Sequence, residues 1–429
     1  MQYIPEIERQ PLAQQAIFQS RKLQELLQYL QANSPYYQRI FREQNIDINS
    51  VKTLADIASL PVTTKEDLQN FSTEHLCVAP DKIREYAATS GTLGAPVTIA
   101  LSAQDLERLA YNEYLSFNCM EPGNTYQLML TLDRQFMAGM AYYSGLQKAE
   151  KAVVRTGPAL PAMQWEVIDR LKSDTLVAVP SFLLKMADYA KANDIDLKST
   201  PVKQVLAIGE SLRDEDLQPS ALAQKIQEAW PVALYGTYAS TEMQTAFTEC
   251  SAFAGGHHHP ELIIVELLDD EGKQVAEDAC GEVTITTLGV EAMPLLRYKT
   301  GDLCKAYYEP CSCGRTTMRL GPVLGRKAQM IKYKGTSLYP ASIANLLHEQ
   351  NIIQDYAMEL KSDDAGQDVL ILHIQTSAGD ATCNEILRPV LQHKLRVVPQ
   401  LVYHTAHTMQ QLLFPAGGRK PNRFIDNRK

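Results

Sequence analysis

Apolar residues recur at helical spacing in two segments near the start of the chain, and a capping pattern predicts a further helix between them. The first segment covers residues 12–30 and is followed by Ser34-Pro35, so the pattern predicts an amphipathic helix that ends there. Thr64 stands shortly before two acidic residues, which indicates a capped helix that begins directly after it. Residues 103–117 again place apolar side chains on one face and predict a third helix.

Short apolar runs alternate with amphipathic segments between residues 125 and 245. The runs predict strands at residues 126–130, 153–154, 175–179, 204–208 and 232–235. Helical patterns at residues 163–172 and 182–192 lie between them. Such alternation is typical of a parallel sheet with helices on its faces. Ligands of these sheets bind beyond the carboxyl ends of the strands.

The pattern changes again after residue 261. Residues 262–267 and 281–286 flank an acidic turn that contains a glycine, which predicts antiparallel strands. A further compact segment begins after Gly325-Arg326. Its expected elements are a helix at residues 341–350 and strands at residues 368–375 and 395–403.

These patterns predict an α/β protein with two domains, because 429 residues exceed what one core usually supports. The large N-terminal domain, residues 1–326, is expected to contain mixed and parallel sheets flanked by helices, together with a β-rich subdomain. The C-terminal domain, residues 327–429, is expected to be small and α+β.

Composition narrows the classes of partner. The formal net charge of −9 argues against nucleic acid or an anionic membrane as the main partner. We find no apolar stretch of transmembrane length and no leader pattern, so the expected location is the cytoplasm. The eight cysteines are too few and too scattered for a disulfide framework, and we expect reduced thiols or metal ligands.

One loop stands out by its chemistry. Residues 89–96 alternate hydroxyls and glycines before a β-branched run, which predicts backbone N–H groups and hydroxyls arranged around an anion. The loop differs from a Walker loop, since Ala95-Pro96 replaces the Lys-Ser/Thr pair and a strand pattern follows. An ordinary hairpin turn is the alternative interpretation.

Five motifs follow one another in an order that carries a resemblance. They are TSGTLGAP at residues 89–96, YGTYASTE at 235–242, YKTGD at 298–302, GRKAQMIKYKG at 325–335 and GRKPNRFIDNRK at 418–429. Over nearly its whole length the chain resembles the adenylate-forming superfamily of acyl-CoA synthetases, and more narrowly the phenylacetate–coenzyme A ligase branch. The Ser34-Pro35-Tyr36-Tyr37 segment and the Cys311-Ser312-Cys313-Gly314-Arg315 run are similar to that branch as well.

The resemblance implies ATP-dependent activation of a small-molecule carboxylic acid, an aryl acid such as phenylacetate. The acid would pass through an acyl-adenylate to its coenzyme A thioester, with release of AMP and pyrophosphate and with Mg²⁺ as cofactor. It also implies a mobile C-terminal domain that rotates between the two half-reactions, and a homodimer is compatible with it. Two other functions stay open: loading of a carrier protein's phosphopantetheine thiol, and nucleotide binding without turnover.

The resemblance also implies roles for particular residues. Lys420 would be the catalytic lysine, and Glu242, after Thr241, would assist catalysis and hold Mg²⁺. Asp302 would accept hydrogen bonds from the ribose hydroxyls, although an aspartate after glycine is also ordinary turn chemistry. The other expected ligand contacts are Ser90, Gly91 and Thr92 for phosphates, Gly209, Glu210, Tyr235 and Gly236 for adenine, Arg326 for ribose or phosphate, and Gly335 in the loop presented to the thiol.

The acyl pocket is expected to draw on Phe136, Gly139, Tyr142 and Tyr143, for which core packing is an equal alternative. The resemblance further implies a structural zinc site whose ligands are Cys250, His257, Cys311 and Cys313. Four protein ligands would close the tetrahedron around Zn²⁺. Buried reduced cysteines beside an unrelated histidine run are the alternative.

Two positions depart from the family pattern. Ala95 stands where a lysine is common, so one cation near the pyrophosphate is absent, and Lys82 or Arg84 could supply a substitute. The hinge after Gly325-Arg326 is Lys327-Ala328-Gln329. Ala328 can still absorb a backbone change, so the domain rotation stays a prediction.

Overall fold

The computed structural model describes residues 3–89, 96–363, 367–414 and 421–428 of the chain. It divides into two compact units, one of Met1–Pro219 with Ala223–Val323 and one of Ser220–Leu222 with Leu324–Lys429. Among the described residues, no helix combines the length and the apolar character needed to cross a membrane.

The chain begins with a series of helical elements, of which α1 is the longest. Their bounds are Glu6–Arg9 (η1), Leu12–Asn33 (α1), Pro35–Glu43 (α2), Ile48–Ser50 (η2), Leu54–Ser59 (η3), Lys65–Asn70 (α3) and Pro80–Lys82 (η4). Ser34 ends α1 as predicted, but it also starts a helix that the sequence pattern did not predict. Its hydroxyl accepts a hydrogen bond from the Tyr37 N–H, and Pro35 occupies the first turn of α2, where a missing N–H costs nothing.

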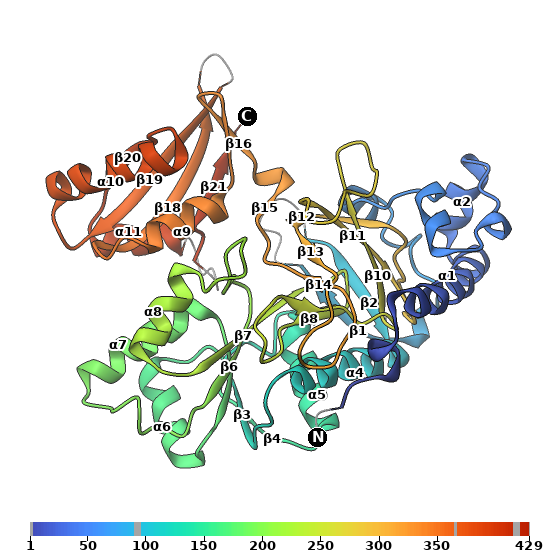
Figure 1. Cartoon of the computed structure of the whole chain (residues 1–429), viewed down its shortest axis with the longest axis horizontal. Coiled ribbons are helices and arrows are strands. Elements are labelled where there is room, and N and C mark those ends of the chain that lie inside the picture. Colours follow the sequence, from blue (N-terminus) through green and yellow to red (C-terminus); the bar gives the residue numbers. More distant parts are fainter. Residues whose placement is uncertain (1–2, 90–95, 364–366, 415–420, 429) are drawn as a thin grey trace. The chain divides into compact units, whose positions relative to one another are not determined.

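A six-stranded sheet forms the lower part of the first unit in Figure 1, with strand order β4-β3-β5-β6-β7-β8. Its strands are Thr125–Leu128 (β3), Ala152–Arg155 (β4), Thr175–Ala178 (β5), Gln204–Ala207 (β6), Ala233–Ser240 (β7) and Thr245–Thr248 (β8). The first five pair in parallel, and β8 is antiparallel to β7. The helices are Ala103–Cys119 (α4), Met137–Lys148 (α5), Pro161–Leu171 (α6), Pro180–Ala192 (α7) and Ala221–Ala229 (α8).

The strand order reverses direction between β3 and β5. The chain passes from β3 through α5 to β4 on one side of β3, then returns through α6 to β5 on the other side. Right-handed crossovers therefore put α5 on one face of the sheet and α6 to α8 on the other, as Figure 1 shows. The carboxyl ends of β3 and β5 make the switch point at which such sheets bind ligands.

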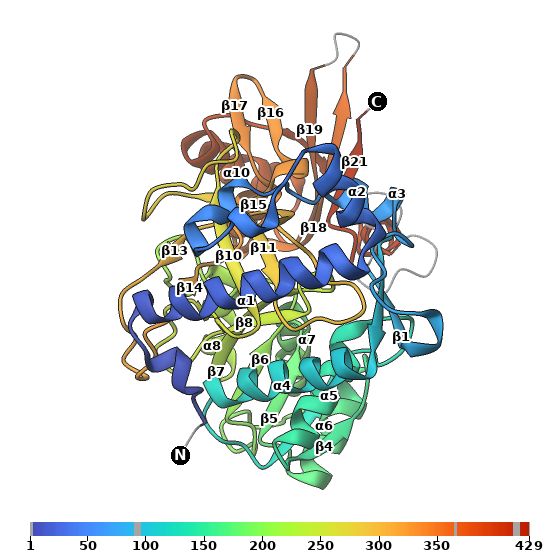
Figure 2. The same cartoon turned by 90° about the vertical axis from the view of Figure 1, so that its right-hand side faces the viewer.

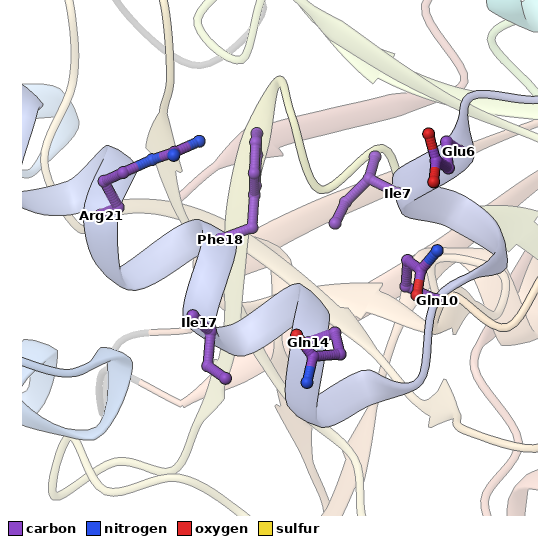
Figure 3. A pocket seen from close by; sticks show the side chains of 7 residues that line it. All are labelled: Glu6, Ile7, Gln10, Gln14, Ile17, Phe18 and Arg21. Carbon is purple, nitrogen blue, oxygen red and sulfur yellow. The ribbon is translucent and has the colours of Figure 1, made fainter.

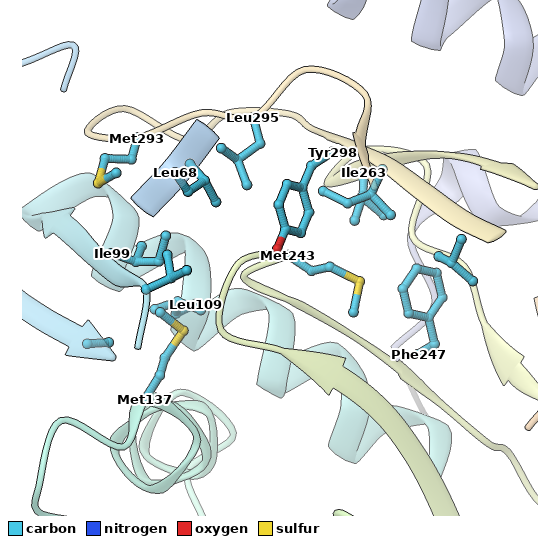
Figure 4. Close-up of a cluster of buried hydrophobic side chains, with 14 of the residues drawn as sticks. Leu68, Ile99, Leu109, Met137, Met243, Phe247, Ile263, Met293, Leu295 and Tyr298 are labelled. Carbon is cyan, nitrogen blue, oxygen red and sulfur yellow. The ribbon is translucent and has the colours of Figure 1, made fainter. Parts of the chain in front are cut away.

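Antiparallel strands make up the rest of the first unit. They are Ile83–Ala88 (β1) with Thr98–Ser102 (β2), then Ile263–Leu268 (β10), Gly281–Thr287 (β11) and Tyr298–Cys304 (β12), and Gly256–His257 (β9), Ala306–Tyr307 (β13) and Arg319–Leu320 (β14). Side chains from these strands and from neighbouring helices fill one core, seen in Figure 4 around Met243 and Tyr298. The predicted α/β fold with a β-rich subdomain is confirmed.

The second unit has its own sheet and core. Its elements are Gly325–Arg326 (β15), Lys327–Gln329 (η5), Ile331–Tyr333 (β16), Thr336–Leu338 (β17), Pro340–His348 (α9), Ile353–Ser362 (β18), Asp368–Thr376 (β19), Asp380–Leu395 (α10), Gln400–Tyr403 (β20), Ala406–Leu413 (α11) and Phe424–Asn427 (β21). The sheet order is β20-β19-β18-β21, and β16 and β17 form a separate hairpin, seen in Figure 2. The strand predicted at residues 395–403 is shorter, because Leu395 ends α10 and Arg396 takes a left-handed conformation before β20 begins.

Candidate active site and candidate metal centre

Asp302 lies on β12 and faces a tyrosine from the parallel sheet. The Tyr238 hydroxyl, on β7, donates a hydrogen bond to Asp302 Oδ2 over 2.8 Å. The Asp302 N–H donates to Thr300 Oγ1, and Thr300 donates in turn to the Val283 carbonyl. Gly301 between them has a φ of +76°, which residues with a side chain rarely adopt. These bonds hold the Asp302 carboxylate in one orientation.

Glu242 lies beside a second tyrosine, Tyr298, which is the first residue of β12. The Tyr298 hydroxyl donates to Glu242 Oε1 over 3.2 Å, and the Glu242 side chain is largely buried. Burial raises the pKa of Tyr298, and the charge of Glu242 raises it further, so the hydroxyl stays protonated and can donate. Asp302 and Glu242 therefore each accept a hydrogen bond from a tyrosine hydroxyl, Asp302 from Tyr238 on β7 and Glu242 from Tyr298 on β12.

Gly236 is held by a buried ion pair. Its N–H donates to Glu249 Oε2 over 2.9 Å, and Glu249 pairs with Arg213 at 3.0 Å. Arg213 also donates to the Leu234 carbonyl. A Cβ at position 236 would lie 3.2 Å from Glu249 Oε2, so the glycine permits the close approach of the carboxylate. The pair thus fixes the backbone of β7 close to Tyr235 and Tyr238.

Gly209 and Glu210 follow the carboxyl end of β6. Gly209 has a φ of +78°, and this turn directs Glu210 towards α7. Glu210 Oε2 accepts a hydrogen bond of 2.7 Å from the Ser181 N–H in the first turn of that helix. Val179, which precedes α7, has no side chain that can cap the helix. Glu210 therefore accepts the hydrogen bond of a free N–H group, that of Ser181, at the N-terminus of α7.

The two tyrosines of β7 have different surroundings. Tyr235 is 1% exposed and packs in the core beside Phe253, with ring centroids 5.1 Å apart. The adenine role expected for Tyr235 stays a prediction. Tyr238 was missed by the sequence reasoning. Residues an odd number of positions apart point to opposite faces of a strand, which was the available signal that only one of these tyrosines can face Asp302.

The four residues expected in the acyl pocket lie at α5. Phe136 immediately precedes the helix, and Gly139 approaches the Thr131 carbonyl so closely that a Cβ would come within 2.2 Å of it. Tyr142 is buried against Phe117. The Arg155 guanidinium lies over the Tyr143 ring, 5.1 Å from the ring centroid. Tyr142 therefore packs in the core, and an acyl role for the four stays a prediction.

Several expected site residues lie outside the described residues: Ser90, Gly91, Thr92, Ala95 and Lys420. Residues on both sides of the expected phosphate loop are described. The Thr89 N–H donates to the Val97 carbonyl, and the Val97 N–H donates to Thr89 Oγ1, so these two residues extend the antiparallel pairing of β1 with β2. Arg84 donates to the carbonyls of Asp81 and Ile83, so its guanidinium is engaged near its own backbone.

Arg326 and Gly335 belong to the second unit. Arg326 is exposed and precedes η5. Gly335 has a φ of +80° in the turn between β16 and β17. Thr241 lies at the end of β7, directly before Glu242.

Three cysteines and one histidine come together at the predicted metal centre. The donor atoms of Cys250, His257, Cys311 and Cys313 all lie within 4.8 Å of one another. Cys250 Sγ is 3.5 Å from Cys311 Sγ, and Cys313 Sγ is 3.5 Å from His257 Nε2. Around tetrahedral Zn²⁺, bonds of about 2.3 Å to sulfur and about 2.0 Å to nitrogen put sulfurs about 3.8 Å apart and sulfur and nitrogen about 3.5 Å apart. The residues therefore fit a zinc ion.

The surroundings of this centre favour a thiolate at Cys313. Hydrogen bonding from Cys250, followed by that from His257, lowers the pKa of Cys313. The fully buried Arg315 donates to Cys313 Sγ over 3.5 Å and to Glu8 Oε2 over 2.7 Å. Glu8 lies in η1, so the Arg315 guanidinium links the N-terminal segment to the candidate metal centre. Positive charge beside three sulfurs offsets the negative charge that they would carry as metal ligands.

Two surface hollows have linings that contain neither Asp302 nor Glu242 nor the four residues of the metal centre. One, of about 620 Å³, is shown in Figure 3 and is lined by Glu6, Ile7, Gln10, Gln14, Ile17, Phe18 and Arg21. It contains none of the expected ligand contacts. The other, of about 660 Å³, lies in the second unit and contains Gly335.

The comparisons with known proteins agree with this geometry. The model of the AMP-binding enzyme family matches residues 29–292, and the chain belongs to that family. Phenylacetate-coenzyme A ligase of Thermus thermophilus is 26% identical over 459 residues, which cover 100% of both chains. The enzyme of the same name from Escherichia coli is 21% identical over 88% of this chain and 86% of its own length.

Solved structures share the fold. A crystal structure of 2-hydroxyisobutyryl-CoA ligase in the postadenylation state, in complex with 2-HIB-AMP, has a TM-score of 0.85 and 21% identity, and the match covers 99% of this chain and 94% of that one. The anthranilate CoA ligase AuaEII in complex with anthranoyl-AMP has a TM-score of 0.57 over 77% of this chain and 65% of that one, at 16% identity. The family match and the curated relatives, together with this shared fold, confirm the resemblance to the adenylate-forming superfamily.

Proposed function

We propose that this protein is an ATP-dependent ligase that joins a carboxylic acid to coenzyme A through an acyl-adenylate and releases AMP and pyrophosphate. The observation that carries the proposal is the pair of carboxylates, Asp302 and Glu242, each bonded to a tyrosine hydroxyl, in a chain that matches phenylacetate-coenzyme A ligases over its length. Because those relatives carry that name, an aryl acid such as phenylacetate is the proposed substrate class.

The first half-reaction must bring two anions together, the carboxylate of the acid and the α-phosphate of ATP. Unit charges of like sign 4 Å apart repel by about 4 kcal/mol at an intermediate dielectric constant, so cations and N–H donors are needed. We assign this work to the N–H groups and hydroxyls of residues 90–92 and to the ammonium group of Lys420. Mg²⁺, held by Glu242, would supply further positive charge to the phosphate oxygens.

The nucleoside is assigned to the ends of β6, β7 and β12. Asp302 would accept hydrogen bonds from the ribose hydroxyls, and the Tyr238 hydroxyl would keep its carboxylate in place. Gly209 and Gly236 would let the backbone approach the base. Arg326 would contact ribose or phosphate, and Phe136, Gly139 and Tyr143 would contribute to the acyl site.

Zinc is assigned a structural role. Cys250, His257, Cys311 and Cys313 would supply four ligands and leave no open position for substrate, which is typical of a structural site. Bound zinc would join β9 to the segment before β14. We also assign a mobile domain to residues 327–429, with Ala328 as the hinge.

One experiment tests the proposed activity. Pyrophosphate release is measured with a panel of carboxylic acids, with and without coenzyme A, for the unaltered protein and for Lys420→Ala. We expect release with an aryl acid, thioester formation on coenzyme A, and loss of release in the variant.

The other outcomes are equally informative. Release without thioester formation on free coenzyme A would favour transfer to a carrier protein. An absence of release with every acid would favour nucleotide binding without turnover. Normal adenylation by Lys420→Ala would remove the main catalytic assignment.

A further inference from the structure

Gly236, which is assigned to the base of the nucleotide, is held by one residue of a neighbouring segment. Its N–H donates to Glu249 Oε2 over 2.9 Å, and its carbonyl accepts a hydrogen bond of 2.9 Å from the Glu249 N–H. A side-chain group and a main-chain group of Glu249 therefore bind both polar groups of the Gly236 backbone. A shift of Glu249 would move this part of β7.

The Glu249 carboxylate is itself held by a buried arginine. Arg213 Nε donates to Glu249 Oε1 over 3.0 Å, and Arg213 Nη2 donates to Glu249 Oε2 over 3.3 Å. Both side chains are largely buried, and Arg213 also donates to the Leu234 carbonyl of β7. A pair with two hydrogen bonds of this kind fixes the orientation of a carboxylate. Arg213 and Glu249 together thus contact β7 at Leu234 and at Gly236.

The residue after Glu249 is a ligand of the candidate metal centre. Cys250 begins, and His257 ends, a loop that contains two of the four expected ligands. Within this loop the Ala252 N–H donates to Cys250 Sγ over 3.4 Å, and the Phe253 N–H donates to the Cys250 carbonyl over 2.9 Å. A metal ion at the cluster would therefore fix the loop at both ends, next to Glu249.

Phe253 gives the loop a second contact with β7 and its arginine. The Phe253 ring centroid lies 5.1 Å from that of Tyr235 and 5.0 Å from Arg213 Cζ. Phe253 has a φ of +52°, a backbone conformation that bulky residues rarely take and that persists where the surroundings impose it. The loop conformation and the packing of Tyr235 and Arg213 are therefore interdependent.

We propose that Glu249 is a positioning residue for the nucleotide and that it couples nucleotide affinity to metal binding at the candidate metal centre. The proposal rests on the proposed function, which assigns the base to the backbone at Gly236. With a metal ion bound, Cys250 would hold the Glu249 main chain and carboxylate in the arrangement that fixes Gly236. In the metal-free chain, the nucleotide would have to order this segment as it binds, so its affinity would be lower.

The first test measures the coupling in both directions. AMP is titrated into the zinc-loaded full chain and into the chain freed of zinc by a chelator, at a temperature at which near-ultraviolet circular dichroism shows that the metal-free chain is folded. We expect the metal-free chain to bind AMP at least about fivefold more weakly, and re-added zinc to restore the affinity. Linkage requires AMP to tighten zinc binding by the same factor, as measured by competition with a chelator. Equal AMP affinity with and without zinc, or a chain that takes up no zinc, would overturn the proposal.

Glu249→Gln tests the residue itself in zinc-loaded protein. The amide keeps the volume but removes the charge that accepts from both Arg213 and Gly236. We therefore expect AMP to bind roughly tenfold more weakly, and removal of zinc to weaken binding no further. Glu266→Gln is the matched control, since Glu266 forms a largely buried pair of 2.9 Å with Arg297 and lies outside β7 and the metal cluster.

The control separates positioning from a merely structural role. Glu266→Gln should bind AMP as the unaltered protein does and keep the coupling to zinc, even if its melting temperature falls. Full AMP affinity in folded, zinc-loaded Glu249→Gln, or an equal loss in Glu266→Gln, would overturn the proposal. Should Glu249→Gln fail to fold, the comparison of zinc-loaded and metal-free protein decides.

These binding measurements need no turnover, so they separate the proposal from the proposed function. Unchanged AMP affinity in the metal-free chain would reject the coupling even if the ligase activity is found. Coupled binding of AMP and zinc in a chain that releases no pyrophosphate with any acid would retain the coupling and reject the activity.

Discussion

The Tyr238 hydroxyl donates a 2.8 Å hydrogen bond to the carboxylate of Asp302, and the two residues belong to different sheets. Tyr238 lies on β7 of the mainly parallel sheet, and Asp302 lies on β12 of the antiparallel one. Burial, followed by the charge of Asp302, raises the pKa of Tyr238 well above its usual range, so the hydroxyl keeps its proton at neutral pH. One hydrogen bond therefore links the two sheets at the proposed ribose site.

Replacement of this tyrosine tests the link. Tyr238→Phe removes the donor, so we expect the Asp302 carboxylate to lose its fixed orientation and KM for ATP to rise roughly threefold to tenfold. AMP binding, measured by titration calorimetry, should weaken by a similar factor. Tyr29→Phe is the control, because it removes a tyrosine hydroxyl that donates to the Glu291 carbonyl and has no assigned role in nucleotide binding, and it should leave both constants near those of the unaltered protein. A change of melting temperature in Tyr238→Phe without any change in nucleotide affinity would contradict the assignment.

The major elements of the fold were predictable because their side-chain patterns are strong. The helix at residues 103–117 and the strands of the parallel sheet were found within a few residues of α4 and β3 to β7. Helix α2 was missed because Pro35 was taken only as the end of the preceding helix. The same proline is compatible with the first turn of a new one.

Within the site, motifs identified the residue types but not their surroundings. Cys250, His257 and the Cys311-Ser312-Cys313 run could be grouped from the sequence, and the fold brings their donor atoms together. The partners of the site residues could not be predicted. Arg213 and Glu249 are 36 positions apart, and Glu8 and Arg315 are 307 positions apart, so only the folded chain pairs them.

The metal centre gives a prediction on composition and stability. We expect purified protein to contain one zinc ion per chain and Cys313→Ser to lose it, because a tetrahedral structural site needs all four ligands. Loss of the metal should lower the melting temperature by roughly 5 °C or more, since binding to the folded state alone stabilises it. Elemental analysis and thermal unfolding measure the two effects.

Cys280→Ser is the control for this variant, because Cys280 is exposed and lies outside the cluster. It should keep both the zinc and the melting temperature. Full zinc content in Cys313→Ser, or protein that folds without any metal and ignores chelators, would refute the site.

Glu113 makes stability depend on pH. It is buried on α4, and burial raises its pKa from 4.5 to about 8, although hydrogen bonds from Ser116 and Asn112 act in the opposite direction. Between these two values the folded chain keeps a proton that the unfolded chain has released. The free energy of unfolding should therefore fall as pH rises from 4.5 to 8, by about 1.4 kcal/mol per pH unit for this group.

Glu113→Gln should remove this slope. The neutral amide can still accept the 3.1 Å hydrogen bond from Asn112, so the packing is retained. Chemical unfolding at several pH values between 5 and 8 compares the variant with the unaltered protein, and Glu107→Gln, an exposed position on the same helix, is the control. Equal slopes in Glu113→Gln and in the unaltered protein would show that Glu113 is ionised when folded.

The proposed hinge at Ala328 is tested by proline. Ala328 lies in η5, and its carbonyl accepts a 3.2 Å hydrogen bond from Arg428. Proline fixes φ at about −65° and restricts the residue before it, here Lys327, so Ala328→Pro should resist any backbone rotation at this point. We expect acid-dependent pyrophosphate release to continue while thioester formation falls at least about tenfold, because only the second half-reaction is proposed to need the rotated domain. Ala328→Gly, which leaves the backbone free, should keep both activities. If Ala328→Pro loses both half-reactions to the same extent while its melting temperature is unchanged, residue 328 is not a hinge between them.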